Sequence, residues 1–495
     1  MTELAQQVDD RKETELVEQP DAFDTDLLDE TDFAETEKQE DSGLLASIRS
    51  LFSWKNYSVY LTTSWVITSF SYLGLFLNLY LIDLEWEYVL IGAVLSVVSL
   101  ASTMGRLVGG YVGDIVNRKH LAVAATFVLA AYNFVMGIST VFVIIFAALL
   151  LFSLVEVFKG GSTAFIMENI PKKHSGLGIS LFSSTGRVFG VLILLALTLV
   201  VPMIGFGPSI RTFFFIGSIL LVVAAIARAA LLEGSKPREV EGRGRHIVEF
   251  FRENRRTAAT IIKAAPGFLA VVMVDAISDS MFKFGTNIYI YEVVGINFEG
   301  IIVMTLSSTL LMIPLLLLTG RSSDRRGVTR SALLIYAFMP ICAAILILAP
   351  MFPYWAPATI VSAAEGAFSG LGAIFSTPFV AVVMKSVNDA LWYLILLTII
   401  QKNLPGKDTS KILGAFWFII YLSSSIAPYI SGIIYQYINP QYLFVIVIIL
   451  NIIIMGTISK RGLIREASLE ELDGGNDGGQ GHSNEDSQDS RKGLS

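Results

Sequence analysis

Three ionisable residues stand at four-residue intervals inside one long apolar run: Asp275, Asp279 and Lys283. This spacing places them on one face of a helix, and Asn287 continues that face. A carboxylate in apolar surroundings can take up a proton, bind a cationic group or form a fixed ion pair with a nearby base. The run therefore indicates either a proton site at one of the two aspartates or a structural Asp–Lys pair, and the sequence leaves both open.

A second set of charged residues lies in two earlier apolar runs. Glu156 and Lys159 are three residues apart and share a helix face, and Arg187 lies at the centre of the next run. Counting along the runs puts Glu156 and Arg187 at the same depth as Asp275 and Asp279. Charged groups at that depth are costly unless they face a cavity or pair with one another. We expect them to line a substrate site, although fixed ion pairs would also explain them.

The composition determines what surrounds these residues. Of 495 residues 53% are hydrophobic and 16% are charged, whereas soluble proteins average about 25% charged residues. Runs long enough to cross a bilayer, which takes ~20 apolar residues, recur between residues 57 and 459. The chain is therefore predicted to be an all-α polytopic membrane protein, and a soluble enzyme is excluded.

The apolar runs predict twelve transmembrane helices in two groups of six. The first group is expected at 57–82, 88–113, 121–139, 141–169, 176–201 and 210–232, and the second at 264–291, 297–319, 331–349, within 357–402, 412–436 and 441–458. The tenth helix has two possible placements. Either 357–384 crosses the membrane, or 376–402 crosses it after a re-entrant stretch.

Charge divides the chain into five predicted segments. They are an acidic disordered tail 1–50, a six-helix bundle 51–232, a basic linker 233–263, a second bundle 264–460, and an acidic disordered tail 461–495. Residues 1–43 hold 16 acidic and 3 basic residues, a composition that cannot build a core. Basic residues gather in alternate loops, which marks the cytoplasmic side. We expect a multi-pass protein of the cell membrane with both termini and the linker in the cytoplasm.

The two groups of helices are internal repeats. Asn78-Leu79-Tyr80-Leu81 and Asn287-Ile288-Tyr289-Ile290 lie 209 residues apart near the ends of the first and seventh runs. The segments GYVGDIVNRK from Gly110 and GRSSDRRGVTR from Gly320 lie 210 residues apart, after the second and eighth runs. One half of the chain therefore repeats the other.

The second pair of segments resembles the signature Gly-x-x-x-Asp-Arg-x-Gly-x-x-Arg of the major facilitator superfamily, and the resemblance covers residues 51–461. The second copy matches at Gly320, Asp324, Arg325, Gly327 and Arg330. The first copy keeps Gly110, Asp114 and Arg118 but has Ile115 where a base is usual and Asn117 where glycine is usual. Asparagine is the residue that most readily shares the left-handed backbone of glycine.

The resemblance implies a fold and a mechanism. Two six-helix bundles would form an inverted-repeat carrier fold that moves a small solute by alternating access, with substrate bound between the repeats. Asp114 and Asp324 would belong to loops that latch the bundles together without contacting substrate. The chain would then be a secondary active transporter, most simply a proton-coupled symporter.

Other functions find less support in the residues. No glycine-rich phosphate loop is present, and the four histidines and the single Cys342 have no ligand spacing. We therefore expect no enzyme activity, no cofactor and no metal. The expected partners are a small-molecule substrate, protons and the lipid bilayer, with no nucleic acid, and the expected state is a monomer. Efflux of hydrophobic or cationic compounds, and a non-transporting receptor or scaffold with this fold, stay open as alternatives, as do the substrate and the direction of transport.

Overall fold

The computed structural model describes residues 44–159, 175–233, 266–320, 328–403 and 409–461, with a few positions between 251 and 262. These residues divide into two units, Met1–Ser53 and Trp54–Ser495. In the first unit the described segment is one helix, α2 (Leu44–Ser53), so the last residues of the predicted N-terminal tail are helical. All elements named below belong to the second unit.

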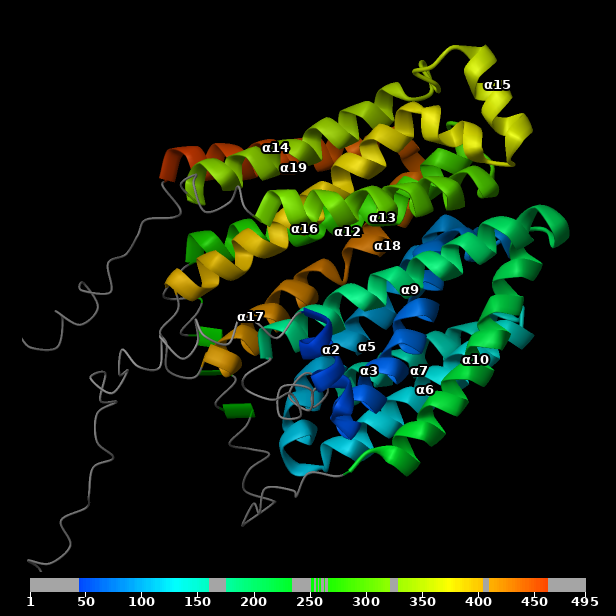
Figure 1. The fold of residues 1–495 in the computed structure, drawn as a ribbon. Helices are drawn as coiled ribbons and strands as arrows, with labels where there is room; N and C mark the ends of the chain where they lie inside the picture. Colours follow the sequence, from blue (N-terminus) through cyan, green and yellow to red (C-terminus); the bar gives the residue numbers. More distant parts are fainter. Residues whose placement is uncertain are drawn as a thin grey trace, which may run out of the picture. The chain divides into compact units, whose positions relative to one another are not determined.

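The second unit is built from helices, and its described residues form no strand beyond one isolated bridge between Tyr354 and Ser376. The first half contains α3 (Lys55–Ser71), η2 (Tyr72–Phe76), α4 (Leu77–Asp83), α5 (Tyr88–Ile115), α6 (Arg118–Ile138), α7 (Phe142–Lys159), α9 (Ser175–Ile204) and α10 (Phe206–Leu231) (Figure 1). The second half contains α12 (Pro266–Glu292), α13 (Phe298–Gly320), α14 (Val328–Leu348), α15 (Ala358–Ala367), η5 (Leu371–Phe375), α16 (Thr377–Asn403), α17 (Thr409–Ser424), α18 (Ala427–Ile433), the π-helical η6 (Ile434–Ile438) and α19 (Pro440–Arg461).

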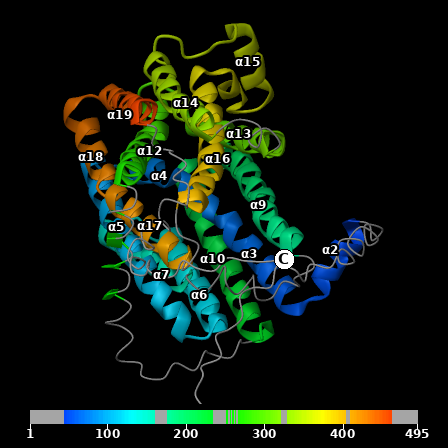
Figure 2. The same cartoon turned by 90° about the vertical axis from the view of Figure 1, so that its left-hand side faces the viewer.

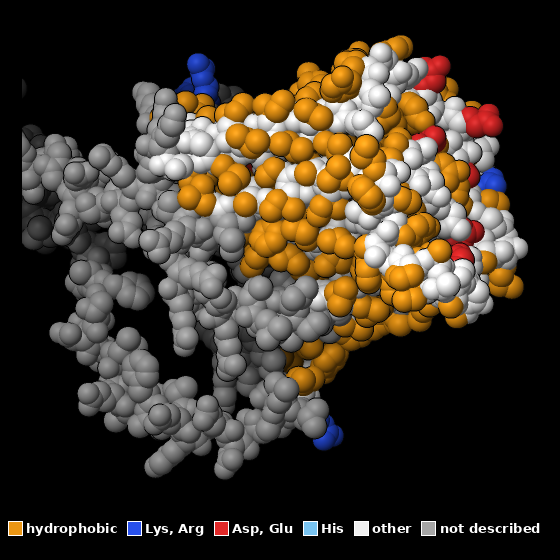
Figure 3. Space-filling view, turned by 90° about the horizontal axis from the view of Figure 1, so that it is seen from above, with side chains coloured by type: hydrophobic (Ala, Val, Ile, Leu, Met, Phe, Trp, Pro, Cys, Tyr) orange, Lys and Arg blue, Asp and Glu red, His pale blue; other side chains and the backbone are white. Residues whose placement is uncertain are grey.

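Many of these helices are long and apolar enough to cross a membrane. Within the described residues seven helices meet that criterion, and three shorter apolar helices, Val188–Ile204, Phe298–Met312 and Ile335–Leu348, add to them. Large apolar side chains face outward along them, such as Val143 at 67% and Met203 at 80% exposure. Figure 3 shows one face of the molecule, where apolar side chains form a broad band and acidic ones gather at one end. A surface of this kind suits contact with lipid and not with water.

The helix boundaries follow local signals. Pro266 opens α12, where its missing N–H is no loss. Gly205 has φ +85, a left-handed conformation that ends α9 and lets α10 start at once. The side chain of Asn117 caps α6 by accepting a hydrogen bond from the Lys119 N–H at 2.9 Å. Its φ is −55, so the left-handed backbone suggested by its place in the glycine position is not found.

The helix in the region of the tenth predicted span has the bounds of the second placement, and the re-entrant course of the stretch before it stays a prediction. α16 runs from Thr377 to Asn403, and the preceding stretch forms the short α15 and η5. α15 buries none of its residues. The carboxylate of Glu365 accepts hydrogen bonds from the Gly370 and Gly372 N–H groups at 2.8 and 3.0 Å, so it folds its own loop.

The two halves meet closely at the end that carries Asp83, Glu87 and Glu292, which we call the acidic end. There α18 lies against α5, as Figure 2 shows. A Cβ atom on Gly92 would lie 2.4 Å from the Pro428 carbonyl oxygen, and one on Gly432 would lie 2.5 Å from the Tyr88 carbonyl oxygen. Glycine at both positions therefore permits the contact.

A pair of equivalent hydrogen bonds joins the halves at the same end. The Asn78 amide donates to the Phe284 carbonyl and the Asn287 amide donates to the Leu75 carbonyl, each at 3.1 Å. Both donors and both acceptors are 209 residues apart, so an approximate two-fold axis relates the bonds. The halves are thus parallel repeats, and any inversion lies within each half.

Candidate functional site

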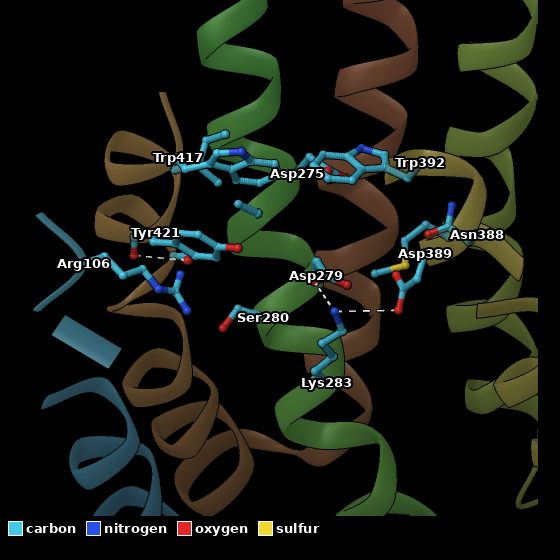
Figure 4. A pocket seen from close by; sticks show the side chains of 14 residues that line it. Arg106, Asp275, Asp279, Ser280, Lys283, Asn388, Asp389, Trp392, Trp417 and Tyr421 are labelled. Atoms are coloured by element: carbon cyan, nitrogen blue, oxygen red, sulfur yellow. Dashed lines mark hydrogen bonds and ion pairs between the residues drawn. The ribbon is translucent and has the colours of Figure 1, made fainter. Parts of the chain in front are cut away.

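A cavity of about 710 Å³ lies where α12, α14, α16 and α17 of the second half face α5 of the first. We call it the central cavity. Its polar walls are Arg106, Asp275, Asp279, Lys283, Asn388 and Asp389, and its aromatic walls are Trp392, Trp417 and Tyr421 (Figure 4). The volume falls in the range typical of small-molecule sites.

The line of charged residues on α12 faces this cavity as its spacing predicted. The Asp279 carboxylate accepts from Lys283 Nζ at 2.7 Å and from Lys385 Nζ at 2.6 Å. Lys385 also binds Asp389, and Lys283 lies 3.6 Å from the other oxygen of Asp389. Two lysines and two aspartates therefore form a closed network between α12 and α16, and Lys385 at its centre is only 8% exposed.

Asp275 lies one helical turn from Asp279 but, unlike Asp279, is not paired with a lysine. It is 9% exposed, and within the described residues its carboxylate has no hydrogen-bond or ion-pair partner. The wall of the second half thus carries three carboxylates and two ammonium groups, with Asp275 in excess. A buried, unpaired carboxylate is costly as an anion, so this is where a proton or a cationic group would bind.

The first half contributes charge of the opposite sign. The Glu156 carboxylate accepts from Arg106 Nε at 2.7 Å and from Lys159 Nζ at 2.8 Å. The Arg106 guanidinium lies 4.0 Å from the ring centroid of Tyr421, which belongs to α17 of the second half. Cation–π contact of this kind ties the two halves together. Of these three residues only Arg106 lines the central cavity, so its guanidinium gives this wall its positive charge.

The other predicted site residues have different positions. Glu156 is 11% exposed beneath Arg106, and Lys159 lines a separate cavity inside the first half. Asn287 helps to close the acidic end instead of lining the central cavity. Arg187 lies in α9, but its side chain is outside the described residues.

The predicted latch loops are described only in part. Gly110 and Asp114 lie in the last turns of α5, where the backbone alone is described, and Arg118 begins α6. Gly320 ends α13 and Arg330 lies in the first turn of α14, again with the backbone alone described. Asp324, Arg325 and Gly327 fall outside the described residues. The latch therefore stays a prediction.

Sequence reasoning missed one residue of the site, Arg106, and left two others, Lys385 and Asp389, undecided. Arg106 was missed although it is the only charged residue of the second predicted helix, 88–113, and that isolation was the available signal. Lys385 and Asp389 depended on where the tenth helix lies. Among the described residues no group of three His, Cys, Asp or Glu side chains could hold a metal ion.

An all-helical body with a charged cavity between two repeats defines a polytopic membrane carrier. The model of the Major Facilitator Superfamily matches residues 59–391, more than half of the chain. The chain belongs to this superfamily and is a multi-pass membrane transporter, not an enzyme. The sequence predicts twelve transmembrane helices. Within the described residues seven helices are long and apolar enough to cross a membrane, and the number twelve stays a prediction.

Solved structures of the same fold resemble the chain at low sequence identity. A mutant of the nucleoside transporter NupG has a TM-score of 0.58 and 13% identity, with 84% of this chain and 99% of that chain covered. A POT family transporter in complex with 5-aminolevulinic acid has a TM-score of 0.59 and 10% identity, covering 81% and 93%. A mutant of the peptide transporter POT has a TM-score of 0.60 and 12% identity, covering 84% and 96%. None of the curated proteins compared with the chain matches it in sequence.

Proposed function

We propose that this chain is a secondary active transporter that moves a small zwitterionic organic solute by alternating access, coupled to protons. The observation that carries the proposal is Asp275, a buried carboxylate without a partner in a cavity that Arg106 lines from the opposite half. A solute with an anionic and a cationic group would satisfy both.

The proposed roles follow from the contacts. Asp275 receives the cationic group of the solute or a proton, because it alone of the three aspartates is not held by lysine. Arg106 offers the remaining N–H groups of its guanidinium to the anionic group, since Glu156 takes Nε–H. Solute bound between them would contact both halves, and this supports closure around it.

The distribution of basic loops supports an orientation in which the acidic end faces outward. Because that end is closed, the conformation described would be closed to the outside. The protein would then lie in the cell membrane with both termini in the cytoplasm. We expect it to act as a monomer, because each half supplies one wall of the cavity.

The test is uptake into proteoliposomes with an imposed proton gradient, using a panel of labelled amino acids, short peptides and nucleosides to find a transported solute. Asp275→Asn should abolish gradient-driven accumulation, because it removes the carboxylate that takes up the proton or the cationic group of the solute. Glu233→Gln, whose carboxylate is 71% exposed and lies outside the cavity, is the control and should transport normally. Gradient-driven accumulation by Asp275→Asn would refute proton coupling at this residue.

Efflux of aromatic or hydrophobic cations is a second candidate, favoured by the walls of Trp392, Trp417 and Tyr421 next to Asp275. The two candidates differ at Arg106. Arg106→Gln should weaken binding of a zwitterion but strengthen binding of a lipophilic cation, because it removes a like charge from the cavity. Tight binding of lipophilic cations and none of zwitterions would replace the first proposal with the second.

A further inference from the structure

A second cavity, of about 440 Å³, lies wholly within the first half. We call it the N-bundle cavity. Its walls come from α3, α5, α6, α7, α9, η2, α4 and α10, and no residue lines both cavities. Most of the lining is apolar, with Leu95, Val98, Leu129 and Leu149 along its length. This cavity could not be predicted from the sequence, because its polar residues come from separate predicted helices.

One end of the N-bundle cavity holds a buried cation. Arg228 is 3% exposed. Its Nε–H donates to Thr63 Oγ1 at 2.8 Å, Nη1 to Thr126 Oγ1 at 3.0 Å and to the Ala122 carbonyl at 3.4 Å, and Nη2 to Ser64 Oγ at 2.8 Å.

These partners satisfy hydrogen bonds but not charge. All of them are neutral, and no carboxylate of the described residues lies within ion-pair distance of Arg228. The Tyr60 ring, 4.4 Å from the guanidinium, is the other contact. Nη2 keeps one N–H without an acceptor, since a guanidinium has five donors. A buried charge without a counter-ion is costly, so this end of the cavity is suited to an anion.

The far end of the N-bundle cavity holds an unsatisfied acceptor. Asn133 is 2% exposed, its amide N–H donates to the Leu129 carbonyl at 2.8 Å, and its Oδ1 has no hydrogen-bond partner. Asn133 lies seven residues beyond Thr126 on α6, which is ~10 Å along the helix axis. The N-bundle cavity therefore has the Arg228 guanidinium at one end, which suits an anion, and Asn133 Oδ1 at the other, which can accept a hydrogen bond. The walls between them are mostly apolar.

We propose that the N-bundle cavity binds a single-chain amphipathic anion: a carboxylate held by Arg228, an alkyl body along the apolar walls, and a hydroxyl that donates to Asn133 Oδ1 at the far end. A medium-chain ω-hydroxy fatty acid has this chemistry. The site is separate from the central cavity, so it does not depend on the proposed transport function. The Glu156 carboxylate forms an ion pair with one residue of each cavity, Lys159 of the N-bundle cavity and Arg106 of the central cavity.

The test uses full-length protein in nanodiscs of zwitterionic lipid and ω-hydroxydecanoate carrying a mid-chain diazirine. After irradiation, labelled positions are mapped by mass spectrometry. Labelling should fall on cavity residues of α6 and α7 such as Leu129 and Leu149. Excess ω-hydroxydecanoate should block it, decanoate should do so about tenfold less well because Oδ1 stays unpaired, and uncharged decanediol should not block it. Label confined to lipid-facing residues such as Val143, or equal competition by decanediol, would overturn the proposal.

Four variants separate binding from folding. Arg228→Gln should lower cavity labelling by about tenfold or more, while Arg211→Gln, on the same helix outside the cavity, should leave it unchanged. Asn133→Leu should remove the preference for the ω-hydroxyl over decanoate. Because Arg228 also joins three helices, Ala125→Phe provides an independent check: it fills part of the cavity, keeps Arg228 and its hydrogen-bond partners in the chain, and should abolish labelling. Unchanged labelling in folded Ala125→Phe protein would place the probe elsewhere and refute the site.

Discussion

The two halves of this transporter share a scaffold but differ in where their charges lie. The positions that correspond to Asp275, Asp279 and Lys283, 209 residues earlier, are Val66 and Phe70 of α3 and Gly74 of η2. The first half instead places its central-cavity charge on α5, where Arg106 pairs with Glu156 of α7. By contrast, the asparagines at the acidic end occur in both halves and make the same hydrogen bond.

This contrast separates two kinds of constraint. Closing a gate between two similar halves is a symmetric task, and equivalent residues perform it on both sides. Binding the proposed zwitterion would be an asymmetric task, for which a free carboxylate on one wall and a base on the other would be suited. We therefore expect substitutions at the acidic end to act alike in both halves, and substitutions in the cavity to act differently.

The largest effect should come from the buried lysine of the second half. Lys385→Met leaves Asp279 and Asp389 without their shared cation, and removing one partner of a buried ion pair costs about 3 kcal/mol. Unfolding of the purified protein by heat or SDS measures the loss. Lys283→Met is the matched control: this lysine is 58% exposed, and an exposed pair contributes less than about 1 kcal/mol. Equal losses in the two variants would show that burial does not set the strength of this network.

A smaller effect is expected from the close contact of α5 with α18. Gly92→Leu puts a side chain against the Pro428 backbone and should cost about 1–3 kcal/mol, which moves the population toward a conformation open at the acidic end. Distances between spin labels on the two halves at that end would report the change. Gly74→Leu serves as the control, because a Cβ at that position meets nothing within 4 Å. If Gly92→Leu left the distances unchanged, the contact would not be part of the gate.

The smallest effects should come from the two asparagines, and they should be equal. Asn78→Ala and Asn287→Ala each remove one hydrogen bond, about 1 kcal/mol or a fivefold shift toward the open acidic end. The same spin-label distances measure each variant and the double variant. Effects that differ by more than about threefold between the single variants would break the symmetry inferred from the repeat.

The sequence predicts the parts of this fold that depend on local pattern. The spacing of Asp275, Asp279 and Lys283 gave their shared helix face, and the repeat gave the correspondence of Asn78 with Asn287. Spacing within one helix cannot tell which helices pack together. The roles of Lys385 and Arg106 therefore depended on tertiary contacts, and Glu156 turned out to pair with Arg106 and Lys159. Asn287 lies on the same face of α12 as Asp275, Asp279 and Lys283 but beyond the end of the cavity. Spacing along a helix predicts which residues share a face but not which of them lie at the depth of the cavity.

The reciprocal asparagine bonds also bear on the kinetics of gating. Because one axis relates them, a rotation of the halves about that axis stretches both bonds by the same amount and breaks them together. In the proposed alternating-access cycle we therefore expect no intermediate with a single bond intact on that path. Solute bound in the cavity would then change how often this end opens, while the width of the opening stays the same.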